Sequence, residues 1–137
     1  MVIRRSGRRT LTLMSDVSGP PPRQRLRSLS GAFRVERGRG AEPGSVTVFV
    51  RDPDGVTVVR AATADDPPEE LWHGLRGVSA HDLDQPGMLA ALLVPLADAG
   101  VPVFVASTFD ADLVFVPVER RDAAVGALRA AGHIVEP

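Results

Sequence analysis

One stretch of the chain repeats apolar side chains with the period of a helix. Its leucines fall at positions i, i+3, i+4 and i+7, and therefore share one face: Leu89, Leu92, Leu93 and Leu96. We predict a helix over residues 87–99, ended by Gly100. Pro95 lies inside it and removes one backbone hydrogen bond, so we expect a kink or a tightened turn there.

The segments around this helix are rich in β-branched residues or alternate with the period of a strand. They predict strands at residues 71–79, 101–106, 113–118 and 133–135, and a second helix at 119–131 that ends at Gly132. The order strand, helix, strand, strand, helix, strand is that of a ferredoxin-like βαββαβ unit of the α+β class. In such a unit both helices cover one face of an antiparallel sheet.

The first half of the chain shows a weaker form of the same order. Strands are predicted at residues 10–13, 32–36, 45–50 and 56–62, with helical turns at Arg23–Ser30 and a short helix capped by an aspartate within residues 65–70. We therefore divide the chain into a flexible basic tail (1–9), a degenerate unit (10–66) and a complete unit (67–137). Because units this small bury little surface alone, we expect two antiparallel sheets packed side by side.

Composition narrows the function. The chain has 137 residues, 44% of them hydrophobic, a net charge of −1 and no cysteine. The hydrophobic fraction argues against a disordered chain, and the near-zero net charge argues against a dedicated nucleic-acid binder. Because the chain has no cysteine and so cannot form disulfides, we expect a cytoplasmic location. The most apolar stretch, Met88 to Ala106, is interrupted by prolines, an aspartate and a glycine, so we expect no membrane span.

Two short motifs carry the candidate chemistry, and we predict a ligand pocket built from them. The candidate ligand-binding residues are Asp84, Gln85, Pro86, Gly87 and Met88 in the first motif, and Ser107, Thr108, Phe109 and Asp110 in the second. Gly87 lets the backbone approach a ligand, and the free N–H groups of the helix that starts there suit a carboxylate. An ammonium group would find acceptors in Asp84 or Asp110. These groups would suit a ligand that carries both a carboxylate and an ammonium group.

The Asp84–Met88 motif, the leucine helix and the following Gly100-Val101 resemble the signature of the ACT-domain family. The segment 104–112 is similar to that of short tandem-ACT proteins, a subfamily related to the ACT modules of aspartate kinase and to the CASTOR arginine sensors. This resemblance implies two ferredoxin-like ACT units and a non-catalytic, regulatory, amino-acid-sensing function. Residues 79–83 depart from the subfamily pattern, and Phe109 stands where it usually has tyrosine.

Simpler explanations exist for each motif residue. Asp84 is also explained as a helix cap, Pro86 and Gly87 as helix-entry geometry, and residues 107–112 as a plain polar hairpin. Trp72 is better explained as a core or interface residue than as a ligand platform. His133 is better explained as a helix-end residue than as a catalytic base.

Three other functions are alternatives for this chain. An enzyme is disfavoured because the sequence contains neither a nucleophile-elbow motif nor a pair of histidines at helical spacing. RNA binding on the face of a sheet requires exposed aromatic side chains, and aromatic residues make up only 4% of the chain. A structural or protein-interaction module without ligand is the main alternative. We expect no metal and no cofactor, and a homodimer formed through unpaired strand edges.

Overall fold

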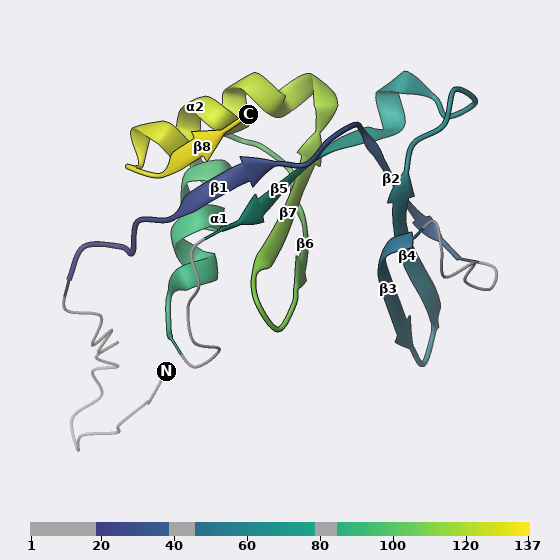
Figure 1. Ribbon diagram of the computed structural model, residues 1–137, viewed down its shortest axis with the longest axis horizontal. Coiled ribbons are helices and arrows are strands. Elements are labelled where there is room, and N and C mark those ends of the chain that lie inside the picture. Colours follow the sequence, from purple (N-terminus) through teal and green to yellow (C-terminus); the bar gives the residue numbers. More distant parts are fainter. Residues whose placement is uncertain (1–18, 39–45, 79–84) are drawn as a thin grey trace, which may run out of the picture.

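The computed structural model describes residues 19–38, 46–78 and 85–137. In chain order the elements are β1 (Arg25–Ser28), β2 (Phe33–Arg37), β3 (Val46–Asp52), β4 (Gly55–Ala61), the 3₁₀ helix η1 (Pro68–Glu70), β5 (Leu71–Gly77), α1 (Met88–Asp98), β6 (Phe104–Ser107), β7 (Asp112–Pro117), the 3₁₀ helix η2 (Val118–Arg120), α2 (Arg121–Ala130) and β8 (Ile134–Glu136) (Figure 1). The predicted tail 1–9, the predicted strand 10–13 and residues 79–84 lie outside the described residues.

The second half has the predicted βαββαβ order, from β5 through α1, β6, β7 and α2 to β8. The helices α1 and α2 lie on the same side of the strands (Figure 1). β6 and β7 form the expected antiparallel hairpin, and β7 also pairs antiparallel with β5. The α+β, ferredoxin-like interpretation of this half is therefore confirmed.

All eight strands of the described residues belong to one sheet. β1 lies between β5 and β8, pairing antiparallel with β5 and parallel with β8. β2 pairs with β5 on the same edge as β1, β4 pairs with β2, and β3 pairs with β4. The expected pair of antiparallel sheets side by side is thus corrected to one mixed sheet, because a strand of the first half inserts into the sheet of the second.

Two local predictions in the first half were wrong. Arg23–Ser30 holds a strand instead of helical turns, because residues 25–28 find hydrogen-bonding partners on both sides in β5 and β8. The short helix near residue 68 exists only as the 3₁₀ turn η1, and Pro67, not an aspartate, stands at its start without a side-chain cap. The Asp66 carboxylate instead binds Arg60.

The main core lies between the helices and the sheet. Its fully buried members come from α1, α2 and the central strands: Leu26, Leu75, Leu92, Leu96, Val114, Val116, Ala124 and Leu128. The predicted leucine stripe is confirmed at Leu92 and Leu96, while Leu89 and Leu93 are only partly buried. Alternation along the strands sends the neighbouring side chains to the opposite face.

A second core covers that opposite face, where β2, β3 and β4 meet β6 and β7. Phe33 and Phe115 contact edge to face with ring centroids 5.4 Å apart, and Trp72 packs against the same cluster. The absence of a side chain at Gly74 makes room for this cluster, because a Cβ there would lie 2.8 Å from Leu29 Cδ1 and 3.1 Å from a Phe115 ring carbon. Trp72 is thus a core residue, as one of the two interpretations expected.

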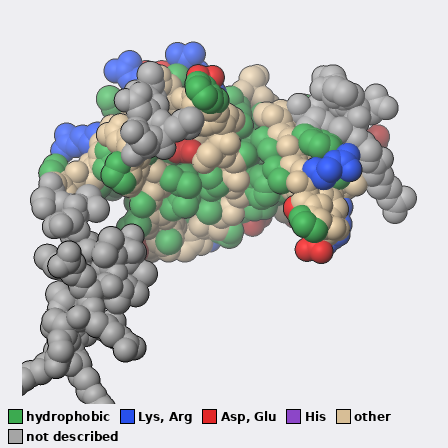
Figure 2. Space-filling view, turned by 90° about the horizontal axis from the view of Figure 1, so that it is seen from below, with side chains coloured by type: hydrophobic (Ala, Val, Ile, Leu, Met, Phe, Trp, Pro, Cys, Tyr) green, Lys and Arg blue, Asp and Glu red, His purple; other side chains and the backbone are tan. Residues whose placement is uncertain are grey.

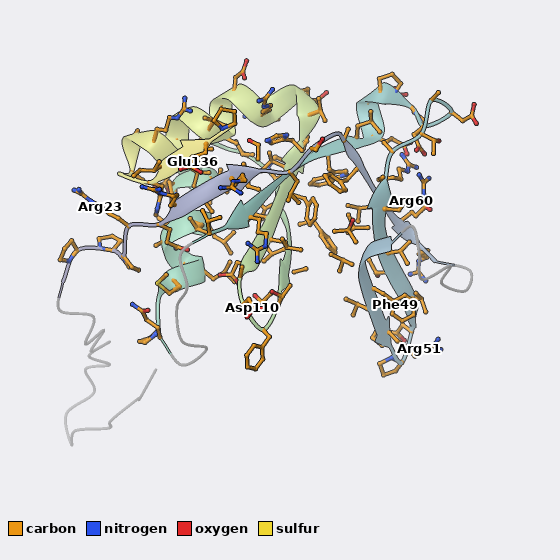
Figure 3. The ribbon with its side chains drawn as sticks, in the orientation of Figure 1. Arg23, Phe49, Arg51, Arg60, Asp110 and Glu136 are labelled. Carbon is orange, nitrogen blue, oxygen red and sulfur yellow. The ribbon has the colours of Figure 1, made fainter. Side chains whose placement is uncertain are left out.

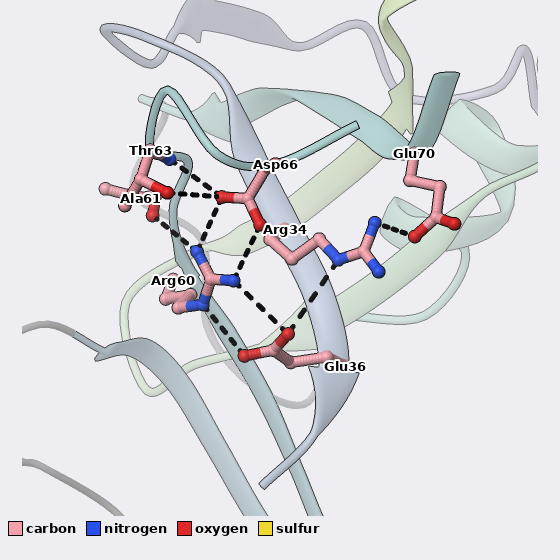
Figure 4. Close-up of polar contacts among 7 residues, drawn as sticks. All are labelled: Arg34, Glu36, Arg60, Ala61, Thr63, Asp66 and Glu70. Carbon is pink, nitrogen blue, oxygen red and sulfur yellow. Dashed lines mark hydrogen bonds and ion pairs between the residues drawn. The ribbon is translucent and has the colours of Figure 1, made fainter. Parts of the chain in front are cut away.

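An ion-pair cluster joins the two halves where the chain turns from β4 toward β5 (Figure 4). The Arg60 guanidinium donates to both carboxylate oxygens of Asp66 at 2.8 Å and to Glu36 Oε1 at 2.8 Å. Asp66 also accepts from the Thr63 backbone N–H at 2.7 Å, and Arg34 pairs with Glu70. These bonds, above all that from Arg60, hold the pKa of Asp66 far below its usual value, and they lower the pKa of Glu36.

None of the helices in the described part of the chain is long and apolar enough to cross a membrane. Seen from below, hydrophobic side chains gather across the middle of the molecule, while charged side chains lie mostly toward its rim (Figure 2).

Candidate functional site

The first candidate motif forms the turn that opens α1. Gly87 stands at the helix N-cap with φ 83° and ψ −1°, the left-handed conformation that disfavours a side chain. Its carbonyl accepts the first helical hydrogen bond, from the Ala91 N–H at 3.0 Å. Among the described residues no side chain caps this helix end, and a Cβ added at Gly87 would meet none of their atoms within 4 Å. The first backbone N–H groups of α1 have the chemistry to hold an anion at this turn.

Two buried polar residues fix the first turn of α1 against the sheet. The Gln24 amide Nε2 donates to the Met88 carbonyl at 2.6 Å, and the Gln24 backbone N–H donates to His133 Nδ1 at 3.1 Å. Gln24 is 4% exposed and His133 is 5% exposed. They belong to the segments that lead into β1 and β8, so the parallel pairing of these strands places both beside α1.

His133 compensates for the proline in α1. Because Pro95 has no N–H, the carbonyl of Ala91, four residues earlier, loses its helical partner. His133 Nε2 lies 2.9 Å from that carbonyl oxygen. Since Nδ1 accepts from Gln24, the neutral tautomer with the proton on Nε2 satisfies both contacts. The helix thus continues through Pro95, and the Ala91 carbonyl has a hydrogen-bond partner from another part of the chain.

A groove runs along the outer side of α1, beginning at Gly87. Its volume is about 460 Å³, within the range of small-molecule sites. The lining is mostly apolar and comes from α1, the segment before β1 and the residues after α2: Gly19, Pro21, Pro22, Gly87, Ala90, Ala91, Val94, Pro95, Asp98, Ala131 and His133. This groove brings the glycine turn next to a surface large enough for an amino acid.

The second candidate motif forms the tight β6–β7 hairpin, with Asp110 at its tip (Figure 3). Ser107 Oγ donates to Asp112 Oδ1 at 2.6 Å, and Thr108 Oγ1 donates to the Ala111 carbonyl at 2.8 Å. Thr108 Oγ1 also accepts from the backbone of Ala111. The two hydroxyls expected to bind a ligand therefore stabilise the hairpin itself.

The remaining members of the hairpin motif face outward. Phe109 is 80% exposed, and Asp110 is exposed as well. None of residues 107–110 lines the groove that Gly87 borders. In the first motif Gln85 and Pro86 are exposed, Met88 is buried, and Asp84 lies outside the described residues. The structure thus places Gly87 beside a cavity, while the hairpin motif is not part of that cavity.

Gln24 was not predicted to support the site, and His133 was interpreted as a helix-end residue, whereas its ring bonds Gln24 and the Ala91 carbonyl of α1. One signal was present: a proline in mid-helix predicts an unpaired carbonyl four residues earlier, which calls for a buried donor. A polar residue on another element is the natural candidate. Its identity depends on the strand pairing, which the sequence pattern did not reveal.

Among the described residues no group of three His, Asp or Glu side chains could hold a metal ion. His73 lies in β5 and is buried, and its Nε2 has no hydrogen-bond partner among the described residues. Burial lowers the pKa of His73, and the positive charge of Arg121 lowers it further. The folded state therefore favours the neutral form of His73 over the charged form.

Comparison with known proteins supports the family assignment of the second half. Residues 68–130 match the model of a family described as ACT domain. The resemblance drawn from the sequence is thereby confirmed for this part of the chain, whereas the tandem arrangement and the relation to CASTOR sensors stay predictions. The comparison with curated protein sequences gives no match.

Solved structures share the fold over most of the chain. A protein from Agobacterium tumefaciens is 25% identical with a TM-score of 0.68, covering 83% of this chain and 92% of its own. A Vibrio cholerae protein of unknown function, described as a possible transport protein, is 22% identical with a TM-score of 0.64, covering 75% and 85%. The regulatory subunit of aspartate kinase from Thermus flavus is 15% identical with a TM-score of 0.54, covering 77% and 95%.

Proposed function

We propose that this protein is a non-catalytic regulatory protein that binds an amino acid at the Gly87 turn. The observation that carries the proposal is the open left-handed turn at the start of α1, within the segment that matches the ACT domain. ACT domains are regulatory modules, and one protein of similar fold is a regulatory subunit of aspartate kinase. The backbone N–H groups of the turn offer the seat for the ligand carboxylate.

The amino group of the ligand needs an acceptor, and the hairpin is the candidate source. The carboxylate of Asp110 is exposed, so it is free to approach a ligand held by another copy of the chain. β6 pairs only with β7 in the described sheet and leaves one edge without a partner strand there. This supports the proposal of a homodimer in which the two motifs meet across the interface.

The finer division of the chain also belongs to this proposal. We take residues 10–66 as a degenerate ACT-like unit and 67–137 as the ACT domain, with the tail 1–9 outside both. The run of strands from β1 to β4, which contains no helix in its described part, supports an eroded unit. The insertion of β1 between β5 and β8 means that neither unit would be stable alone.

A thermal-shift screen against the twenty amino acids tests the proposed function. A ligand at 100 times its dissociation constant stabilises the folded state by about 2.7 kcal/mol, which gives a clear rise in melting temperature. Gly87→Ala should weaken that response. Gly100→Ala is the matched control, because Gly100 also has a positive φ (66°) but lies at the other end of α1.

The outcome separates two functions. A response that is lost in Gly87→Ala and kept in Gly100→Ala supports ligand binding at the turn. If no amino acid shifts the melting temperature, the alternative of a structural or protein-interaction module is favoured. The exposed Phe109 and the internally bonded hydroxyls of Ser107 and Thr108 are the observations that favour this second candidate.

A further inference from the structure

We infer that the groove beside Gly87 holds the side chain of the ligand and selects a large apolar amino acid, such as leucine or methionine. The inference rests on the proposed function, because it takes the ligand carboxylate to sit at the Gly87 turn. It adds the chemical class of the ligand.

The shape of the groove supports this assignment. Gly87, Ala90, Ala91, Val94 and Pro95 lie at i, i+3, i+4, i+7 and i+8, so they form one continuous stripe along the outer side of α1. This stripe starts at the turn where the carboxylate would bind. A side chain that leaves the turn along the helix therefore enters the groove.

The surface chemistry of the groove is apolar on both sides. Val94 is 58% exposed although it is a large hydrophobic residue, and it forms the middle of the α1 wall. Pro21 and Pro22 form the opposite wall, where they offer ring carbons and no backbone N–H. Such walls give an aliphatic or thioether side chain contact area, and they give a polar one no hydrogen-bond partner.

Two polar groups line the groove, and neither suits a charged ligand side chain. The ring nitrogens of His133 are occupied by Gln24 and by the Ala91 carbonyl. Asp98 is exposed and lies eleven residues along the helix from Gly87, a rise of about 16 Å. Asp98 therefore lies at the far end of the groove from the turn where the ligand carboxylate would bind. A ligand with an acidic side chain would find no basic residue among the described residues of the lining.

Calorimetric titration of the full chain with leucine, alanine, lysine and aspartate tests this inference. Burial of the leucine side chain should make leucine bind about tenfold or more tighter than alanine, with lysine and aspartate weaker than leucine. Val94→Glu places a carboxylate in the groove and should weaken leucine binding about tenfold or more, with little effect on alanine. Val118→Glu is the matched control, because Val118 is 40% exposed and does not line the groove.

The results distinguish this inference from the proposed function. Tighter binding of lysine or aspartate than of leucine, or unchanged leucine affinity in Val94→Glu, overturns the apolar groove and leaves amino-acid binding in place. Binding of none of the four, together with no response in the twenty-amino-acid screen, overturns both. The melting temperature of Val94→Glu shows whether this variant is folded. If it is not, Val94→Thr, which introduces a hydroxyl without a charge, takes its place and should also lower the affinity for leucine.

Discussion

His133 Nε2 donates a hydrogen bond of 2.9 Å to the carbonyl of Ala91, the acceptor that Pro95 leaves without a helical partner. The contact joins residues 42 positions apart in the chain. It ties the end of the α2–β8 connection to the helix that carries the Gly87 turn. The proline inside α1 is thereby compatible with a rigid helix.

A double-mutant cycle between His133 and Pro95 measures this compensation. His133→Ala leaves the buried Ala91 carbonyl and the Gln24 N–H unsatisfied, so the free energy of unfolding should fall by about 2–4 kcal/mol. In a Pro95→Ala background the new N–H at position 95 can bind the Ala91 carbonyl. There we expect His133→Ala to cost less by about 1 kcal/mol in urea unfolding. Equal costs in both backgrounds would show that His133 does not act through Ala91.

The Arg60 cluster should make stability depend on acid pH. The pKa values of Glu36 and Asp66 are lowered in the folded state, so their contribution is complete above about pH 4.5 and decreases as pH falls below about 4. Arg60→Met removes the partner of both carboxylates. We expect the variant to be less stable than the wild type at pH 7, with a gap that narrows toward pH 3. A gap in urea midpoint that stays constant over this range contradicts the assignment.

His73 should add a second pH effect near neutrality. Because burial lowers its pKa below the unfolded value of about 6.5, the unfolded chain binds a proton more readily, and stability decreases as pH falls below about 6.5. In His73→Leu this decrease should be smaller. Chemical unfolding at pH 7.5 and pH 5.5 measures it, and identical pH dependence in the two proteins would count against a buried neutral His73.

The same substitution at two glycines should act with opposite sign. Gly74→Ala places a Cβ against Leu29 and Phe115 and should cost about 1–3 kcal/mol of unfolding free energy through overpacking. At Gly126, inside α2, a Cβ meets nothing within 4 Å, so Gly126→Ala should stabilise by about 0.5–1 kcal/mol. Thermal unfolding of the pair checks this, and a neutral Gly74→Ala would mean that the second core adjusts freely.

The sequence predicted the second half of the fold well, because its patterns are local. The spacing of Leu92 and Leu96 identified α1, and the β-branched runs on either side of residues 108–111 identified the hairpin. The strand β1 was missed, since Leu26 and Leu29 fit a helical spacing and only long-range pairing makes the segment extended.

The candidate site was predicted in part. The glycine turn was identified from Pro86-Gly87 before an apolar helix, and the structure shows the left-handed conformation that requires glycine there. The roles of Gln24 and His133 depend on β1 lying next to β8, which no local pattern encodes. Residues 107–110 line no part of the groove at Gly87 within the described chain. A pocket formed by both motifs therefore stays a prediction.

We propose above that an amino acid binds at the Gly87 turn and extends along α1. A titration of the ¹⁵N-labelled full chain with leucine, followed by backbone amide NMR, tests it most directly. We expect saturable shifts that are largest at Gly87, Met88 and Ala90 and continue to Val94. Shifts confined to other parts of the sheet, or none at millimolar leucine and none with any other amino acid, would contradict it.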